Sequence, residues 1–237
     1  MHSAMELRDR PSPNFDARPG AGAVDMLILH YTGMRTAEDA LERLCDPAAK
    51  VSAHYVIEEE GAVWRLIDEA RRAWHAGLSC WRNCRDVNGA SIGIELVNPG
   101  HEFGYRAFPE AQMRALEELA RGILSRHAIP PRAVLGHSDV APQRKQDPAE
   151  LFDWPRLAQA GIGLWPDFRA NTPVAATTQE LQSQLRAIGY DCPVSGLLDA
   201  PTQAVLTAFQ RHFRPARCDG VADAETRRRI ASLARSV

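Results

Sequence analysis

The chain has 237 residues, of which 45% are hydrophobic and 24% are charged, a mixture typical of globular proteins rather than of disordered, collagen-like or coiled-coil chains. Twenty-eight basic and 30 acidic residues give a formal net charge of −2, so no overall charge attracts the chain to nucleic acid or to an anionic membrane. The apolar runs are far shorter than the roughly 18 residues of a membrane span. The composition therefore argues against a nucleic-acid-binding protein and a membrane-spanning protein.

The first 20 residues place charged side chains between three prolines and contain no apolar stretch of the kind found in a secretory signal. Their low hydrophobicity predicts a flexible leader before the first strand. A cytoplasmic protein is the direct interpretation of this segment. A start further upstream that carries an export signal is the alternative.

Five cysteines leave at least one thiol free or paired between chains. Cys80 with Cys84, and Cys192 with Cys218, are the pairs that could form disulfides, and simple reduced thiols are equally compatible with the sequence.

Five short apolar segments predict the strands of a sheet. The first, VDMLILHY, is rich in branched side chains, as buried strands are. A turn at residues 58–61 joins two further segments and predicts a hairpin, and SIGIELV alternates in polarity as a strand does. The predicted strands span residues 24–31, 53–57, 63–67, 91–97 and 134–135.

Three helices are predicted among and after these strands. Thr36 is placed to cap a helix over residues 37–44, and Pro109 opens a longer helix that ends near His127. A third helix lies near residues 155–160. Because strands alternate with helices without a strict βαβ rhythm, we expect an α/β fold with a mixed central β-sheet flanked by helices.

The last part of the chain predicts a second, smaller domain. Residues 161–177 combine early glycine and proline with later small residues, and we expect a linker there. Three helical segments follow over residues 179–188, 202–213 and 224–234, anchored by Leu181, Leu185, Ile188, Val205, Phe209 and Ile230. The sequence therefore predicts domains over residues 21–160 and 178–237.

His30, His137 and Asp147 are the first candidates for a functional site. His30 ends the first predicted strand, where an unpartnered imidazole would be costly to bury. His137 follows the short strand at 134–135, and Asp147 lies further along the same loop. Two histidines and one carboxylate form a ligand set of catalytic zinc sites, which keeps a fourth position open for water. A structural histidine and a turn aspartate are the alternative.

Lys145 and Glu95 are candidates for the chemistry beside such a metal. Pro148 favours extended backbone at Asp147, so Lys145 and Asp147 project to the same side, where a cation can stabilise charge on a carbonyl oxygen. Glu95 lies within the predicted strand at 91–97 and could pass a proton from water to a leaving amine. A glutamate on the solvated face of an edge strand is the alternative.

Five segments of the first predicted domain form an ordered pattern: LILHYTG (27–33), VSAHYVIEEEGAVWRLI (51–67), RAWHAG (72–77), SIGIELVNPG (91–100) and GHSDVAPQRKQDP (136–148). In this order they resemble the zinc-dependent N-acetylmuramoyl-L-alanine amidases of the AmpD/AmiD type, also called amidase type 2, which are related to peptidoglycan-recognition proteins. The resemblance extends over about residues 20–160 and includes both flanks of each candidate ligand. It is therefore far more specific than any single motif.

The resemblance implies that His30, His137 and Asp147 bind Zn²⁺ and that Glu95 and Lys145 are the catalytic glutamate and lysine. It implies hydrolysis of the amide between N-acetylmuramic acid and L-alanine in peptidoglycan or muropeptides. A peptidoglycan receptor or scaffold that does not cut is the alternative, although relatives of that kind lack a complete ligand set. Zinc-dependent cleavage of another bond, within the stem peptide, also stays open.

Substrate contacts are implied less directly. His75 and Trp81 lie in a loop that resembles the wall of the family's substrate cleft, and Asn98 follows the strand of Glu95. Packing and turn roles are the alternative for all three. His54 stands where many related proteins have a tyrosine, so we assign it no role.

Three segments of the second predicted domain, TQELQSQLRAIGY (178–190), GLLDAPTQAVLTAFQRHF (196–213) and DGVADAETRRRI (219–230), resemble the type 1 peptidoglycan-binding domain. Such a domain would tether the enzyme to its polymeric substrate and raise the local concentration. A helical cap or a dimerisation module is the alternative. A wall-binding domain implies a periplasmic or cell-envelope site, in contrast to the cytoplasmic location that the leader suggests.

Overall fold

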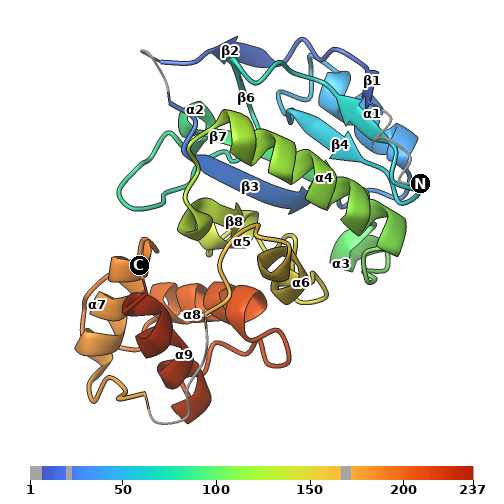
Figure 1. The fold of residues 1–237 in the computed structure, drawn as a ribbon. Coiled ribbons are helices and arrows are strands. Elements are labelled where there is room, and N and C mark those ends of the chain that lie inside the picture. The colour runs from blue at the N-terminus through green and yellow to red at the C-terminus, as the bar shows by residue number, and fades with distance from the viewer. Residues whose placement is uncertain (1–6, 20–22, 167–171, 237) are drawn as a thin grey trace.

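A mixed six-stranded sheet lies at the centre of the N-terminal domain in the computed structural model, which describes residues 7–19, 23–166 and 172–236. Its strands are β1 (Leu7–Asp9), β3 (Met26–Tyr31), β4 (Tyr55–Ile57), β5 (Val63–Arg65), β7 (Ser91–Leu96) and β8 (Val134–Gly136). Their order in the sheet is β1-β5-β4-β7-β3-β8 (Figure 1). β3 pairs in parallel with β7 and β8, whereas β4 pairs antiparallel with β5. The predicted mixed sheet and the predicted hairpin are confirmed.

Helices accompany this sheet: α1 (Ala37–Cys45), α2 (Val87–Ala90), α3 (Gly100–Phe103), α4 (Glu110–Arg126), α5 (His137–Val140) and α6 (Trp154–Gln159). The predicted cap of α1 is confirmed, because the Thr36 hydroxyl accepts a hydrogen bond from the backbone N–H of Asp39 at 3.1 Å. The long helix α4 crosses the sheet (Figure 1), and its buried side includes Met113, Leu116 and Ile123. None of the helices within the described ranges has the length and apolar content that a bilayer span needs.

Strand register assigns the side chains to the two faces of the sheet. β3 and β7 pair Leu29 with Ile94 and His30 with Glu95, and residues paired in this way share a face. Leu29 and Ile94 belong to the apolar core that includes the buried side of α4. His30 and Glu95 therefore lie on the opposite face, where Val56 of β4 pairs with Glu95 and packs in a second apolar cluster with α1.

The prediction of a flexible leader over residues 1–20 is wrong for most of the part that the structure describes. β1 pairs in parallel with β5, and β2 (Phe15–Ala17) pairs antiparallel with β6 (Arg71–Ala73). Between the two strands, the buried Asn14 side chain donates hydrogen bonds to two backbone carbonyl oxygens of residues 46 and 51. Pairing with strands far along the chain orders a segment whose own hydrophobicity is low. Residues 1–6 and 20 lie outside the described residues.

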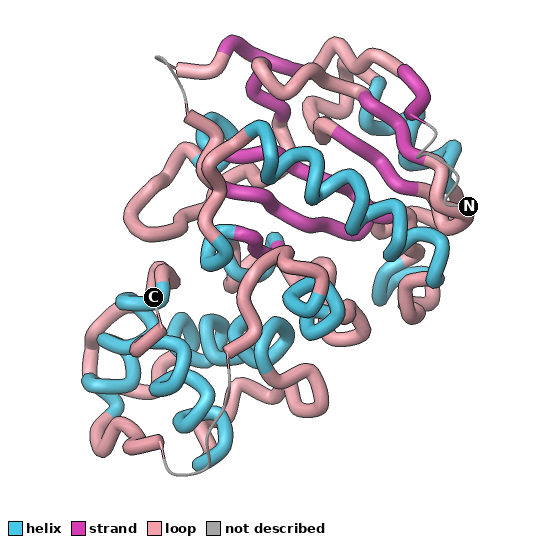
Figure 2. Tube along the Cα trace, viewed as in Figure 1, coloured by secondary structure: helices cyan, strands magenta, loops and turns pink. Residues whose placement is uncertain are grey.

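The C-terminal domain contains α7 (Thr178–Ile188), α8 (Ala200–Phe213) and α9 (Ala224–Ala234), joined by loops (Figure 2). The predicted three helices are confirmed, and all six predicted apolar anchors are buried among them. Residues 167–171 of the predicted linker lie outside the described residues.

A D-x-x-T pattern begins both α8 and α9. The Asp199 carboxylate caps α8 by accepting a hydrogen bond from the backbone N–H of Thr202, and the Thr202 hydroxyl lies 2.8 Å from Nε2 of the buried Gln182 on α7. The equivalent residues at the start of α9 are Asp223, Thr226 and Gln210. The two turns are therefore built by the same set of hydrogen bonds.

The C-terminal domain contacts the N-terminal domain where α8 packs against α5 (Figure 1). Asp139 of α5 is fully buried, and its Oδ1 accepts a hydrogen bond from the Tyr190 hydroxyl at 2.6 Å. Its Oδ2 lies 2.7 Å from Nδ1 of His212, whose ring stacks on Trp154 with a centroid distance of 3.7 Å. One carboxylate thus joins two residues of the C-terminal domain to the N-terminal domain.

All five cysteines are free thiols, including Cys80, Cys84, Cys192 and Cys218. Burial raises the pKa of the Cys192 and Cys218 thiols to about 11, so both are protonated at neutral pH.

Candidate metal centre

The candidate ligands meet at the carboxyl ends of neighbouring parallel strands. His30 lies near the end of β3, β8 ends at Gly136 immediately before His137, and Asp147 follows in a loop. The backbone N–H of Ser138 donates a hydrogen bond to the carbonyl oxygen of Asp147 at 3.0 Å, which ties that loop to His137. A Cβ at Gly136 would stand 2.8 Å from the ring of the proline after Asp147. The absence of a side chain at Gly136 therefore lets the two segments approach.

The three ligand atoms form a nearly equilateral triangle. Nδ1 of His30 lies 3.0 Å from Nδ1 of His137 and 3.0 Å from Oδ2 of Asp147. Nδ1 of His137 lies 3.1 Å from the same carboxylate oxygen. All three side chains are buried, and their donor atoms can hold one metal ion.

The protonation states of His30 and Asp147 favour binding of a cation. Burial and the neighbouring His137 lower the pKa of His30 to about 4, which leaves its imidazole neutral at pH 7. Burial alone would raise the pKa of Asp147, but His137 and His30 outweigh that effect and hold it well below its usual range. A neutral imidazole and an ionised carboxylate are the forms that bind metal.

The loop at residues 75–76 contacts the Nε2 atoms of His30 and His137, the ring nitrogens that face away from the ligand triangle. Nε2 of His30 lies 3.0 Å from Nδ1 of His75, and Nε2 of His137 lies 3.0 Å from the carbonyl oxygen of Ala76. A metal ion on the two Nδ1 atoms leaves the proton on each Nε2, which then donates to these acceptors. Such contacts fix the orientation of metal-binding imidazoles.

A chain of hydrogen bonds continues behind His75. Its Nε2 lies 3.1 Å from the Ser91 hydroxyl, which donates to the backbone carbonyl oxygen of Val87. Because Nδ1 of His75 accepts from His30, its Nε2 carries the proton and donates to Ser91. The His75 ring lies directly on Gly93, where an added Cβ would stand 2.4 Å from Cγ of His75. The contributions of Ser91 and Gly93 were not predicted, because no spacing or residue type in the sequence marks them.

A cavity of about 570 Å³ opens beside the triangle, and Glu95 and Lys145 both line it. Oε2 of Glu95 is buried and has no hydrogen-bond partner among the described residues. Burial and the nearby Asp147 raise the pKa of the Glu95 carboxyl well above its ordinary value, and the Lys145 ammonium acts in the opposite direction. The exposed Lys145 side chain is thus close enough to influence Glu95 electrostatically.

The three predicted substrate contacts lie in different surroundings. His75 lines the cavity, but it is only 8% exposed and faces His30. Trp81 is buried against Tyr190 of the C-terminal domain, with ring centroids 5.0 Å apart. Asn98 is fully buried, and its side chain donates to the backbone of Arg106. Neither Trp81 nor Asn98 is among the described residues that line the cavity, and their contact with substrate stays a prediction.

His54 is fully buried on the same face of the sheet. Its Nδ1 accepts a hydrogen bond from the backbone N–H of Gly93 at 3.0 Å, and its Nε2 lies 3.1 Å from the carbonyl oxygen of Arg71. His54 therefore supports the strand behind His75.

Comparison with known families agrees with this arrangement. Residues 20–150 match the profile of the N-acetylmuramoyl-L-alanine amidases, which is more than half of the chain, and residues 175–230 match a peptidoglycan binding domain. The chain belongs to the N-acetylmuramoyl-L-alanine amidase family. The resemblance identified from the sequence is thus confirmed for both domains.

Two individual relatives match different shares of the chain. N-acetylmuramoyl-L-alanine amidase AmiD of Escherichia coli is 39% identical over 225 residues, which cover 86% of this chain and 79% of AmiD. The 1,6-anhydro-N-acetylmuramyl-L-alanine amidase AmpD of Haemophilus influenzae is 31% identical and covers 64% of this chain and 90% of AmpD.

Two solved structures share the fold. The E. coli AmiD complex with anhydro-N-acetylmuramic acid-L-Ala-D-γ-Glu-L-Lys is 36% identical, has a TM-score of 0.81, and covers 93% of this chain and 92% of the AmiD chain. AmpDh3 of Pseudomonas aeruginosa in complex with an anhydromuramic pentapeptide is 33% identical, has a TM-score of 0.84, and covers 92% of this chain and 94% of the AmpDh3 chain.

Proposed function

We propose that this chain is a zinc-dependent amidase that hydrolyses the bond between N-acetylmuramic acid and L-alanine in peptidoglycan or muropeptides. The observation that supports this proposal most strongly is the buried triangle of His30, His137 and Asp147 beside a cavity lined by Glu95 and Lys145. A peptidoglycan receptor that does not cut would have no need for the Glu95 carboxylate in this cavity, whose Oε2 is buried and has no hydrogen-bond partner in the described part of the chain.

Zinc fits the donor set. Tetrahedral zinc with bonds of about 2.0–2.1 Å separates neighbouring ligand atoms by about 3.3 Å, and the observed separations are 3.0–3.1 Å. His30 Nδ1, His137 Nδ1 and Asp147 Oδ2 would hold the ion, and the contacts to His75 and Ala76 would orient the two rings. When bound, zinc supplies Lewis acidity that polarises the scissile carbonyl and acidifies water.

Glu95 would transfer protons in the reaction, and Lys145 would stabilise the negative charge of the transition state. The Glu95 carboxylate takes a proton from the attacking water and later delivers a proton to the leaving nitrogen of L-alanine. The Lys145 ammonium stabilises the negative charge that develops on the carbonyl oxygen, a contribution of about 3 kcal/mol in comparable sites. The sheet holds Glu95 beside His30 in register, so the proton carrier and the ligand set have fixed relative positions.

The substrate class follows from the relatives. The AmiD and AmpDh3 structures contain anhydromuramyl peptides, and AmpD is named for the 1,6-anhydro sugar. We therefore infer that this chain accepts anhydromuropeptides, and that its peptidoglycan-binding domain holds it on wall material. Fractionation of cells that produce a tagged full-length chain tests this location, because a wall-bound enzyme would be recovered with the envelope rather than with the cytoplasm.

Mass spectrometry of an anhydromuramyl tripeptide incubated with the purified chain tests the reaction. We expect separate anhydromuramic acid and L-alanyl peptide, no products after treatment with a chelator, and recovery on addition of zinc. The His137→Ala variant should lose both bound zinc and activity, whereas His101→Ala, which lies outside the ligand triangle, should retain zinc. Products cut within the stem peptide would contradict the assigned bond, and binding of the tripeptide without cleavage would favour a receptor.

A further inference from the structure

The cavity beside the ligand triangle has one wall residue from the C-terminal domain. Arg211 of α8 lines it together with residues of the N-terminal domain, and no other described residue beyond position 147 does so. Its guanidinium lies 3.5 Å from Oε1 of Gln146, the residue before Asp147. Its Nε is buried and has no hydrogen-bond partner among the described residues. The half-buried Arg211 side chain therefore lines the cavity from a domain that the sequence assigns only to tethering.

The position of Arg211 is fixed by the contact between the domains. The next residue, His212, is held by Asp139 at 2.7 Å and by the stacked ring of Trp154. Tyr190 bonds the other oxygen of the same carboxylate at 2.6 Å. Because these three contacts are buried, α8 cannot turn or slide without breaking them, and Arg211 stays directed at the cavity.

The charge of the cavity indicates an anionic ligand. Four of the six charged side chains that line it are cationic, and one of its two carboxylates, Asp147, belongs to the ligand triangle. Arg144 is already engaged, because it donates to the carbonyl oxygens of Ala76 and Leu78. Arg211 retains donors in the fork geometry that binds carboxylates.

We propose that Arg211 is a substrate-binding residue that recognises a carboxylate of the muropeptide stem, so that the docked C-terminal domain completes the specificity site. This inference rests on the proposed amidase function. The stem of the tripeptide in the E. coli AmiD complex retains the α-carboxylate of its γ-linked glutamate and the carboxylate of its terminal lysine. An amidase without this domain would lack the guanidinium.

The test compares anhydro-N-acetylmuramic acid-L-Ala-D-γ-Glu-L-Lys with the same compound amidated at both stem carboxylates. We expect the full-length wild-type chain to prefer the free acid in kcat/KM by about 10- to 100-fold, as a charge-assisted pair predicts. Arg211→Gln should reduce this preference to within about threefold, mainly by raising KM for the free acid, and Arg211→Lys should restore part of it. Arg186→Gln, an exposed arginine of α7 that does not line the cavity, is the matched control.

Zinc content and thermal unfolding midpoint should be equal in all variants. An unchanged preference in Arg211→Gln, or an equal loss on both compounds, would overturn the assignment to carboxylate recognition. If the wild-type chain cleaves neither compound, the amidase proposal fails, and calorimetric binding of the two compounds to the same variants then decides the role of Arg211 separately. Binding that does not distinguish the compounds, or that Arg211→Gln leaves unaltered, would overturn the inference.

Discussion

At the scale of single residues, Glu95 has the surroundings of a group that carries a proton. Its carboxylate shares a sheet face with His30 and lies near the charge of Lys145, and its buried oxygen has no hydrogen-bond partner among the residues that the structure describes. We expect Glu95→Gln to keep one zinc ion per chain, because Glu95 is outside the ligand triangle, and to lose about 10²- to 10⁴-fold in kcat. Metal analysis and single-turnover hydrolysis measure the two effects, with the exposed Glu60→Gln as control. Full activity in Glu95→Gln would remove Glu95 from the mechanism.

Gly93 is important because His75 lies on it. We expect Gly93→Ala to displace the His75 ring, since the new Cβ would stand 2.4 Å from it, and so to free Nε2 of His30. Loss of such an outer contact costs about 10- to 100-fold in metal affinity, which competition with a chromophoric chelator measures. Gly122→Ala in α4 is the control, because its Cβ would meet only the end of the Arg126 side chain. Equal zinc affinity in both variants would show that His75 does not orient the ligand.

The three residues of the ligand triangle could be predicted from residue type and position, whereas the residues that orient their side chains could not. His30 ends one predicted strand, His137 follows another, and Asp147 precedes a proline, so each carries a local signal. His75 and Ser91 support the site only because the fold stacks their segments, and the spacing between them encodes nothing about that contact.

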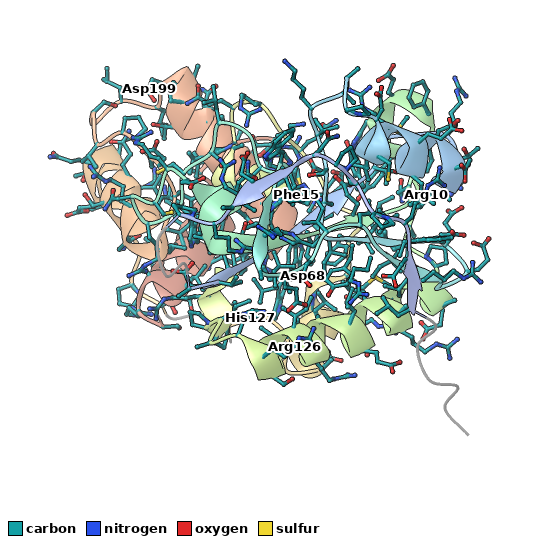
Figure 3. The ribbon with its side chains drawn as sticks, turned by 90° about the horizontal axis from the view of Figure 1, so that it is seen from above. Arg10, Phe15, Asp68, Arg126, His127 and Asp199 are labelled. Carbon is teal, nitrogen blue, oxygen red and sulfur yellow. The ribbon has the colours of Figure 1, made fainter. Side chains whose placement is uncertain are left out.

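At the scale of elements, the carboxyl end of α4 is connected to the sheet through Glu69. Arg126 and His127 lie close together at this end of the helix (Figure 3), and both bond the Glu69 carboxylate at 2.7 Å. Burial would raise the pKa of Glu69, but the bonds from Arg126, His127 and Tyr55 outweigh it and lower the pKa to about 2. The stabilisation is therefore present above pH 4.5 and is lost as the pH falls toward 2.

We expect Glu69→Gln to unfold at lower urea concentration at pH 7, by the equivalent of about 2 kcal/mol. Its stability should also depend less steeply on pH between 4.5 and 2 than that of the wild type. Urea titrations followed by circular dichroism across this range give both quantities, and the exposed Glu42→Gln serves as control. Parallel pH profiles for wild type and Glu69→Gln would contradict the assigned ion pairs.

The elements with a strong apolar period were predicted within about two residues of their bounds, as β3, β7, α4 and the three C-terminal helices show. β1, β2 and β6 were not predicted, because their three-residue segments carry charge and exist as strands only through pairing with distant partners. α5 was missed for a related reason, since four residues are too few for a helical period.

At the scale of the whole molecule, the buried Asp139 carboxylate is a central contact between the two domains, because it bonds both Tyr190 and His212. We expect Asp139→Asn to leave Tyr190 or His212 without a charged acceptor and to loosen the docked domain. Its thermal midpoint should fall by about 5–10 °C, and small-angle scattering should report a larger maximum dimension. Asp191→Asn is the control, because its contact with Arg85 between the two domains is 3.5 Å long and exposed to solvent. Unaltered scattering from Asp139→Asn would show that apolar packing alone holds the domains.

The sequence indicated two domains and a tether, but it did not indicate that they share a buried surface. Trp81 and Tyr190 meet across this surface, yet the sequence predicted a substrate contact for Trp81, with packing as the alternative, and marked no role for Tyr190. A tethered module and a docked module have the same local sequence pattern, so only the three-dimensional arrangement separates them.

The short helix α5 contributes both to the candidate metal centre and to the contact with the C-terminal domain. His137 points to the ligand triangle and Asp139, two positions later, to the C-terminal domain. A shift of this turn on ion binding would therefore alter the contact with the C-terminal domain, and thermodynamic linkage makes such a coupling reciprocal. Adding or removing the ion should then change how firmly the C-terminal domain is docked, and fixing that domain in place should change the affinity for the ion.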